Sequence, residues 1–95
     1  MATKKFTKSK TITKGNLENV PANKPGVYRI KNTQDDILYI GIAKRGRLPE
    51  RIYEHKGEFK GGTRFQYKVT KTKEAAEHLE RREIRDYHPP KNKDK

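Results

Sequence analysis

Two strand-like runs separated by a short polar cluster constrain the fold of this chain more than any other feature. The first run contains Val27, Tyr28 and Ile30, and the second spans residues 37–42. The four polar residues between them, 32–35, are typical of a hairpin loop. We therefore predict an antiparallel hairpin at the start of the organised part of the chain.

The loop position also predicts which residues of the hairpin face each other. A loop centred at residues 33–34 pairs Tyr28 with Tyr39 and Gly26 with Gly41. Two tyrosines beside two glycines would form a hydroxyl-lined notch that a ligand backbone or a phosphate could approach. The alternative is an ordinary aromatic cross-strand pair, which only stabilises the sheet.

A helix is predicted over residues 48–59. Pro49 suits the first helical turn, where its missing N–H would have no partner. The apolar stripe of this helix includes His55 at a position where a core residue is expected, and Arg51 lies four residues earlier on the same flank. A hydrogen-bonded core histidine beside a surface arginine is the structural interpretation of this pair, and a functional pair is the other.

The remaining elements are a third strand and a final helix. Apolar and polar residues alternate over 64–70, which predicts a strand. The final helix is predicted from Thr72, a plausible cap, to Tyr87, before two prolines. Glu80 lies between apolar neighbours of this helix, a position that a solvated glutamate does not need. The order of elements is β-β-α-β-α, which predicts an α/β fold with a three-stranded antiparallel sheet and flanking helices.

The length and the small apolar content predict one domain. The chain has 95 residues, of which 29% are hydrophobic and 38% are charged, so its core must be small. Residues 1–14 lack helical periodicity and are predicted to be a basic flexible leader, with a short strand over 6–12 as the alternative. We assign residues 15–92 to the domain and residues 93–95 to a disordered tail.

The charge of the chain predicts a polyanionic partner. There are 24 Lys and Arg against 12 Asp and Glu, a formal net charge of +12. Nucleic acid is the expected partner, and the basic loop with Lys44, Arg45 and Arg47 is the expected contact. The alternative is that basic tails serve only to keep a small protein soluble.

Several classes of site and location are disfavoured by composition. The chain has no cysteine, which excludes disulfides, thiolate metal sites and thiol nucleophiles. The spacing of its three histidines does not suggest a zinc site. No apolar run approaches the roughly 20 residues of a membrane span, and the N-terminus lacks the apolar stretch of a signal peptide. We therefore expect a cytoplasmic protein with no membrane partner.

The hairpin carries a motif pair found in a known family. The tripeptides Gly26-Val27-Tyr28 and Tyr39-Ile40-Gly41, ten residues apart, resemble the paired signature of the GIY-YIG nuclease family. Further matches follow in the family's order: Arg51, His55, Glu80 and Asn92. The residues of these motifs most resemble those of the nuclease domain of the bacterial excision-repair incision subunit. One departure is Ile42, because that subfamily usually has lysine directly after its second tripeptide.

The resemblance implies an activity. It implies a small α/β sandwich that hydrolyses phosphodiester bonds with Mg²⁺ or Mn²⁺, leaving 5′-phosphate and 3′-hydroxyl ends, with DNA a more plausible substrate than RNA.

It also implies a role for each matched residue. Glu80 would be the sole protein ligand of the metal, and Arg51 would stabilise the transition state. One of Tyr28 and Tyr39 would be the general base, and His55 would assist it. Asn92 would fix a phosphate or a water molecule. A competing hypothesis is a basic nucleic-acid-binding module without catalysis. Glu80 argues against it, because a carboxylate facing a phosphate opposes binding unless a metal lies between them.

Overall fold

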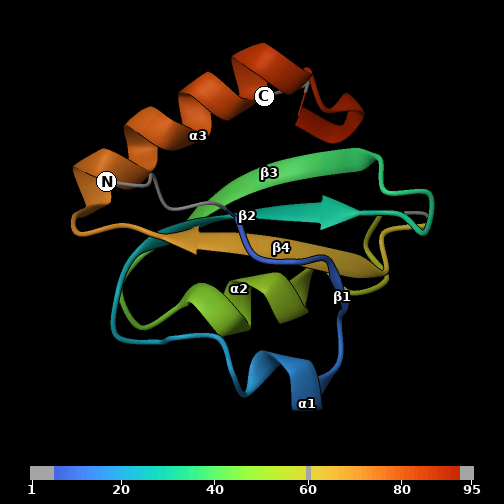
Figure 1. The fold of residues 1–95 in the computed structure, drawn as a ribbon, viewed down its shortest axis with the longest axis horizontal. Coiled ribbons are helices and arrows are strands. Elements are labelled where there is room, and N and C mark those ends of the chain that lie inside the picture. The colour runs from blue at the N-terminus through green and yellow to red at the C-terminus, as the bar shows by residue number, and fades with distance from the viewer. Residues whose placement is uncertain (1–5, 60, 93–95) are drawn as a thin grey trace.

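The computed structural model describes residues 6–59 and 61–92. Four strands, three helices and a final 3₁₀ turn follow one another along the chain (Figure 1): β1 (Lys10–Thr11), α1 (Lys14–Leu17), β2 (Gly26–Lys31), β3 (Ile37–Ala43), α2 (Leu48–Glu54), β4 (Arg64–Val69), α3 (Lys73–Tyr87) and η1 (Pro90–Asn92). The α/β class predicted from the sequence is confirmed. No helix within the described residues is long and apolar enough to cross a membrane.

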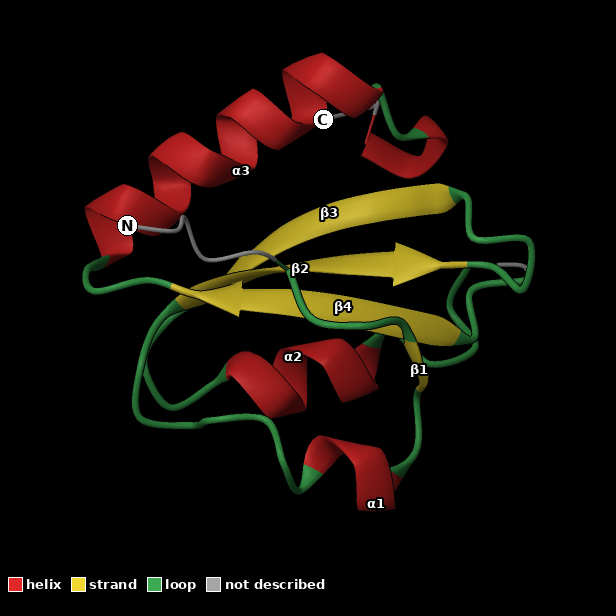
Figure 2. Cartoon of the chain, viewed as in Figure 1, coloured by secondary structure: helices red, strands yellow, loops and turns green. Residues whose placement is uncertain are grey.

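The sheet has four antiparallel strands in the order β1-β4-β2-β3, so the three-stranded prediction was wrong. The additional strand is β1, where Lys10 pairs with Phe65 and Thr11 with Arg64. Two residues are too few to produce a visible alternation in the sequence. Helices cover both faces of the sheet: α1 and α2 lie on one side and α3 on the other (Figure 2).

The predicted leader over residues 1–14 is therefore partly built into the fold. Residues 1–5 lie outside the described residues. Beyond them, the Thr7 amide donates to the Tyr67 carbonyl at 3.0 Å, and the Ile12 side chain is only 1% exposed. The strand that was the alternative interpretation of this segment is present, although it is shorter than residues 6–12. The predicted tail, residues 93–95, lies outside the described residues.

The hairpin register differs by two residues from the prediction. Tyr28 pairs with Gly41, and Ile30 pairs with Tyr39. One residue of the shift comes from a bulge at Leu38, because the pairing passes from Ile30–Tyr39 to Lys31–Ile37. The other comes from the turn, where the Asn32 side-chain oxygen accepts hydrogen bonds from the amides of Gln34 and Asp36. Side chains alternate with a period of two, so this shift leaves both tyrosines on one face of the sheet.

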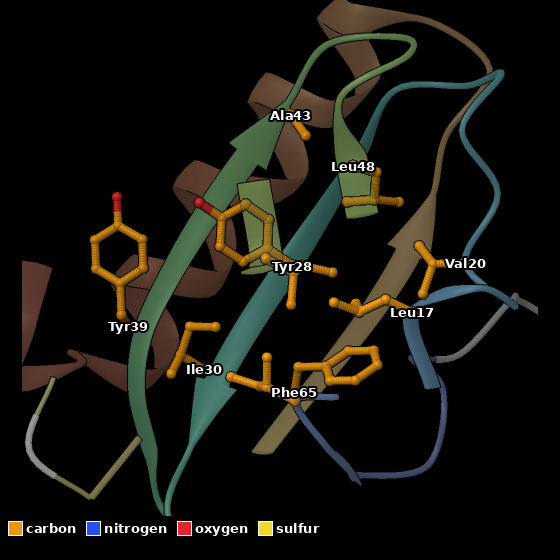
Figure 3. Close-up of a cluster of buried hydrophobic side chains, with 10 residues drawn as sticks. Leu17, Val20, Tyr28, Ile30, Tyr39, Ala43, Leu48 and Phe65 are labelled. Carbon is orange, nitrogen blue, oxygen red and sulfur yellow. The ribbon is translucent and has the colours of Figure 1, made fainter. Parts of the chain in front are cut away.

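The core lies mainly on the α1 and α2 side of the sheet. Buried side chains from β2, β3, β4 and both helices meet there (Figure 3), among them Leu17, Val20, Tyr28, Ile30, Tyr39, Leu48 and Phe65. A smaller cluster on the opposite face joins the sheet to α3 through Val27, Ile40, Ala76 and Leu79. The larger cluster places both motif tyrosines beside α2.

Helix α2 ends five residues earlier than predicted. It stops at Glu54, and His55 is its C-terminal cap residue. The chain then turns through Gly57, whose φ of 79° lies in the left-handed region that glycine adopts without strain. His55 consequently lies at the junction of a helix and a turn, where its ring is packed from several directions.

Helix α3 matches its prediction closely. The Thr72 side chain accepts a hydrogen bond from the Ala75 amide at 3.0 Å, as expected of an N-terminal cap. The helix ends at Tyr87, and His88 adopts a left-handed conformation with φ of 49°. This turn sends the chain through η1 back against β3.

Candidate active site

The two motif tyrosines and His55 form a compact aromatic group. The Tyr28 hydroxyl and His55 Nε2 are hydrogen-bonded at 2.7 Å. The Tyr39 ring centroid lies 6.3 Å from that of Tyr28 and 4.9 Å from that of His55. Phe59 stacks on both His55 and Tyr39, at centroid distances of 5.2 Å and 5.0 Å. The structure therefore brings together the tyrosines and the histidine that the sequence singled out.

Gly41 determines where the Tyr28 ring can lie. The ring lies across β3 (Figure 3), and a Cβ atom at position 41 would overlap its Cζ and hydroxyl oxygen. The predicted notch between two facing glycines is absent, because Gly26 pairs with Ala43 and not with Gly41. Gly41 makes room for a tyrosine of this chain rather than for a ligand.

His55 has a second partner that the sequence analysis missed. Its Nδ1 is hydrogen-bonded to the Glu58 carboxylate, while the His55 ring itself is buried. The helix was expected to continue to residue 59, which hid this contact. The available signal was an acid three residues after the histidine, with the turn residue Gly57 between them.

Arg51 lies beside this group at the edge of a basic hollow. Its side chain is 38% exposed, and its Nη1 contacts the Glu54 carboxylate at 3.1 Å. The hollow has a volume of about 390 Å³ and is lined by Ile42, Lys44, Arg47, Arg51 and Lys73. Two of the three predicted nucleic-acid contacts, Lys44 and Arg47, line it. The third, Arg45, is exposed but is not among the lining residues.

The electrostatics of the site link α3 to the tyrosines. Burial raises the pKa of Tyr28 well above its usual value, and Tyr39 and Glu80 raise it further, whereas Arg51 lowers it. The pKa of Arg51 is raised, chiefly by its interaction with Tyr28. Glu80 acts on Tyr28 although α3 covers the opposite face of the sheet. We attribute this to the position of β3, which is an edge strand, so that no further strand lies beyond it to separate α3 from Tyr28.

The raised pKa of Tyr28 bears on which tyrosine can be the base. A nearby cation such as Arg51 favours the phenolate that a base requires. For Tyr28, however, the loss of water around a completely buried side chain outweighs the effect of Arg51.

Asn92 supports β3 directly. Its Oδ1 accepts a hydrogen bond from the Ile40 amide at 2.8 Å, and its Nδ2 donates to the Ile40 carbonyl at 3.0 Å. The side chain is buried rather than exposed at the chain end. This differs from the expected contact with a phosphate or water molecule. It follows from the sheet order, because the outer backbone groups of an edge strand need partners.

The donor set at the site suits a hard cation with few protein ligands. Within the described residues, no group of three or more histidine or acidic side chains is placed to hold a metal ion. Glu80 is partly exposed on α3 and offers carboxylate oxygens. Mg²⁺ keeps several of its waters and is often bound through one or two carboxylates, so the residues present fit such an ion with Glu80 as its protein ligand.

The arrangement defines the chain as a small α/β catalytic domain, with an aromatic pair, an arginine and a carboxylate at one sheet edge. In a comparison with known families, residues 24–94 match the GIY-YIG catalytic domain. The chain belongs to the GIY-YIG nuclease family, as its motifs indicated.

Individual relatives agree with this assignment. The chain is 35% identical over 102 residues to UvrABC system protein C of Bacteroides thetaiotaomicron, a match that covers 97% of this chain and 16% of that protein. The chain thus spans only a small part of the curated relative. Among solved structures, it is similar to the GIY-YIG N-terminal endonuclease domain of UvrC from Thermotoga maritima bound to magnesium. That match has a TM-score of 0.63 and 25% identity, and covers 84% of this chain and 99% of the other. A point mutant of the same domain, bound to its catalytic divalent cation, matches with a TM-score of 0.62.

Proposed function

We propose that this chain is a divalent-metal-dependent endonuclease that hydrolyses phosphodiester bonds in DNA and leaves 5′-phosphate and 3′-hydroxyl ends. The observation that carries the proposal is the contact of Tyr28, Tyr39 and His55 beside a basic hollow that Arg51 lines. The magnesium bound to the similar UvrC domain supports the choice of cation.

Glu80 would hold Mg²⁺ or Mn²⁺ at the edge of the sheet. A bound cation of this kind neutralises charge on a phosphate and on its leaving oxygen. The carboxylate has a second effect of its own, because it repels the phosphate backbone when no cation is present. Glu80 therefore makes substrate approach depend on the metal.

Arg51 would bind the scissile phosphate. Its guanidinium is partly exposed and borders the basic hollow, and its current partner is the exposed carboxylate of Glu54. A phosphate can replace that carboxylate and accept two parallel hydrogen bonds from the guanidinium. Charge that develops on the phosphate oxygens during attack is then stabilised by a donor already in position.

Tyr39 is the better candidate for the general base. The Tyr28 hydroxyl is completely buried, bonded to His55 and disfavoured as a phenolate by its raised pKa. The Tyr39 side chain retains 8% exposure beside the same histidine. Tyr39, as its phenolate, would accept the proton of the attacking water and become a neutral phenol, and Tyr28 would order the hydrogen bonds around it.

The substrate and location complete the proposal. The basic hollow is compatible with any nucleic acid, and DNA is preferred over RNA because the curated relative belongs to the UvrABC system. A cytoplasmic location fits a cysteine-free chain with this partner.

A cleavage panel tests this proposal. Labelled single-stranded, duplex and branched DNA, with matched RNA, would be incubated with Mg²⁺, with Mn²⁺ or with EDTA. We expect cleavage of DNA only when a divalent cation is present, and the products should be ligatable without phosphorylation. Undiminished cleavage in EDTA would contradict the mechanism. Tight binding without cleavage of any substrate would instead favour a basic binding module.

A further inference from the structure

The two ring nitrogens of His55 face different chemical groups. Nδ1 faces the carboxylate of Glu58, and Nε2 faces the hydroxyl of Tyr28 at 2.7 Å. The ring is buried between the rings of Tyr28, Tyr39 and Phe59. Its orientation is therefore set by packing, and its hydrogen bonds by the two partners.

The chemistry of these partners determines the direction of each hydrogen bond. A neutral imidazole has one nitrogen that donates and one that accepts. An ionised carboxylate only accepts, so Nδ1 of His55 must carry the proton when it faces Glu58. Nε2 then has a lone pair, and the Tyr28 hydroxyl donates to it.

We infer that Glu58 is a positioning residue that holds His55 in the Nδ1–H tautomer, so that the Tyr28 hydroxyl donates its hydrogen bond to His55 and presents only oxygen lone pairs to its other neighbours. In the opposite tautomer, Nε2–H would donate to the Tyr28 oxygen. The Tyr28 proton would then point away from His55, and the hydroxyl would become a donor toward the site.

The consequence concerns the water and the tyrosine next to this network, and it rests on the proposed nuclease function. A Tyr28 hydroxyl whose proton is held in the hydrogen bond to His55 does not donate to Tyr39, the residue proposed to accept the water's proton. A Tyr28 hydroxyl that donates would compete for the same lone pairs that must receive the water's proton. The carboxylate of Glu58, which lies outside the aromatic group, thereby determines which of His55 and Tyr28 is the donor in the hydrogen bond between them.

The tautomer can be measured without any substrate. In the full chain with ¹⁵N-labelled histidine, long-range proton–nitrogen correlations distinguish a protonated from an unprotonated ring nitrogen. The His78 and His88 signals would be assigned with His78→Gln and His88→Asn. We expect His55 to show a protonated Nδ1 and an unprotonated Nε2 at neutral pH. An Nε2–H tautomer or a doubly protonated ring in the wild type would overturn the inference.

Two variants of Glu58 test its cause. Glu58→Ala removes the acceptor, and we expect the Nε2–H tautomer to become populated. Glu58→Gln keeps a carbonyl oxygen that can accept from Nδ1, and should retain the wild-type tautomer. The Glu58 side chain is 53% exposed, so both variants should fold, which thermal melting would verify. An unchanged tautomer in Glu58→Ala would overturn the inference.

Single-turnover cleavage at saturating protein tests the consequence. Glu58→Ala should slow cleavage by at least about tenfold, whereas Glu58→Gln should stay close to the wild type. Glu18→Ala, which removes an exposed glutamate at the end of α1, is the matched charge control and should cleave normally. A changed tautomer with an unchanged rate would overturn the positioning role. If the wild type cleaves nothing, the proposed function fails while the tautomer measurement still decides the role of Glu58.

Discussion

The Tyr28 ring packs directly on the backbone of Gly41. Replacing Gly41 with alanine would force the ring away from β3 and weaken its hydrogen bond to His55. We expect Gly41→Ala to lower the free energy of unfolding by about 1–3 kcal/mol, the usual cost of overpacking, and to reduce cleavage. Denaturant unfolding would measure this. The control is Gly15→Ala in α1, where a Cβ meets nothing within 4 Å and no loss of stability should follow.

Asn92 satisfies two backbone groups of β3 at once. Asn92→Ala would leave the amide and carbonyl of Ile40 without these partners. The expected loss of stability is about 1–3 kcal/mol, together with slower cleavage because Ile40 lies between Tyr39 and Gly41. Lys91→Ala, an exposed change at the preceding residue, should leave both quantities nearly unchanged. A melting temperature equal to the wild type with reduced cleavage would instead favour a direct contact between Asn92 and the substrate.

Glu80 is the residue whose role separates catalysis from binding. Glu80→Gln keeps the shape of the side chain and removes the charge that would hold a cation. Cleavage should be lost, while DNA affinity stays the same or increases because a repulsive charge is gone. Filter binding and cleavage assays would measure the two effects. Glu77→Gln on the same helix, where Glu77 faces Lys73 at 3.8 Å, is the control and should retain activity. Retained cleavage with altered stability in Glu80→Gln would show a purely structural role.

Among the elements, β1 shows how a very short strand can be important for the fold. It brings the adjacent Ile12 into the core, although Lys8 and Lys10 before it are exposed. We expect Ile12→Ala to lower the free energy of unfolding by about 2–5 kcal/mol, as for other buried aliphatic side chains. Thr11→Ala, at an exposed position of the same strand, should have a much smaller effect. Equal stability of both variants would show that the segment is a leader without a structural role.

The edge position of β3 explains how residues from both sides of the sheet reach one site. Tyr28 and His55 lie on the α2 side, Glu80 comes from α3, and Asn92 pairs with the outer backbone of β3. A central strand would have a neighbouring strand on each side, and these strands would keep residues of the two faces apart. The groups proposed to be catalytic, which come from opposite faces, can therefore meet around this edge.

At the scale of the whole molecule, the charge of +12 should dominate affinity. Replacing Lys44, Arg45 and Arg47 with alanine should weaken DNA binding and reduce the slope of log affinity against log salt by about 0.9 for each lost phosphate contact on duplex DNA. Fluorescence anisotropy at several salt concentrations would measure the slope. Replacing Arg81, Arg82 and Arg85 on the exposed side of α3 removes the same charge. An equal loss in that control would mean that net charge, and not the basic hollow, sets binding.

Much of the fold follows from local patterns in the sequence. The apolar runs of β2 and β3, the alternation in β4, the cap at Thr72 and the end of α3 at Tyr87 were all predictable, because such patterns and caps depend on residues a few positions apart. The candidate site residues were found from motif spacing, and the structure brings Tyr28, Tyr39 and His55 into contact.

What the tertiary structure alone decided are contacts between distant or irregular segments. The pairing of β1 with β4 and the bond between Asn92 and Ile40 join residues more than 50 positions apart, whose energies depend on the whole arrangement. The hairpin register and the contact of Glu58 with His55 depend on turn geometry that the residue types do not specify uniquely. The sequence by itself therefore indicated which residues are candidates for the chemistry. The folded chain decided which hydrogen bonds hold them, because each of those bonds forms only after the backbone has placed both partners.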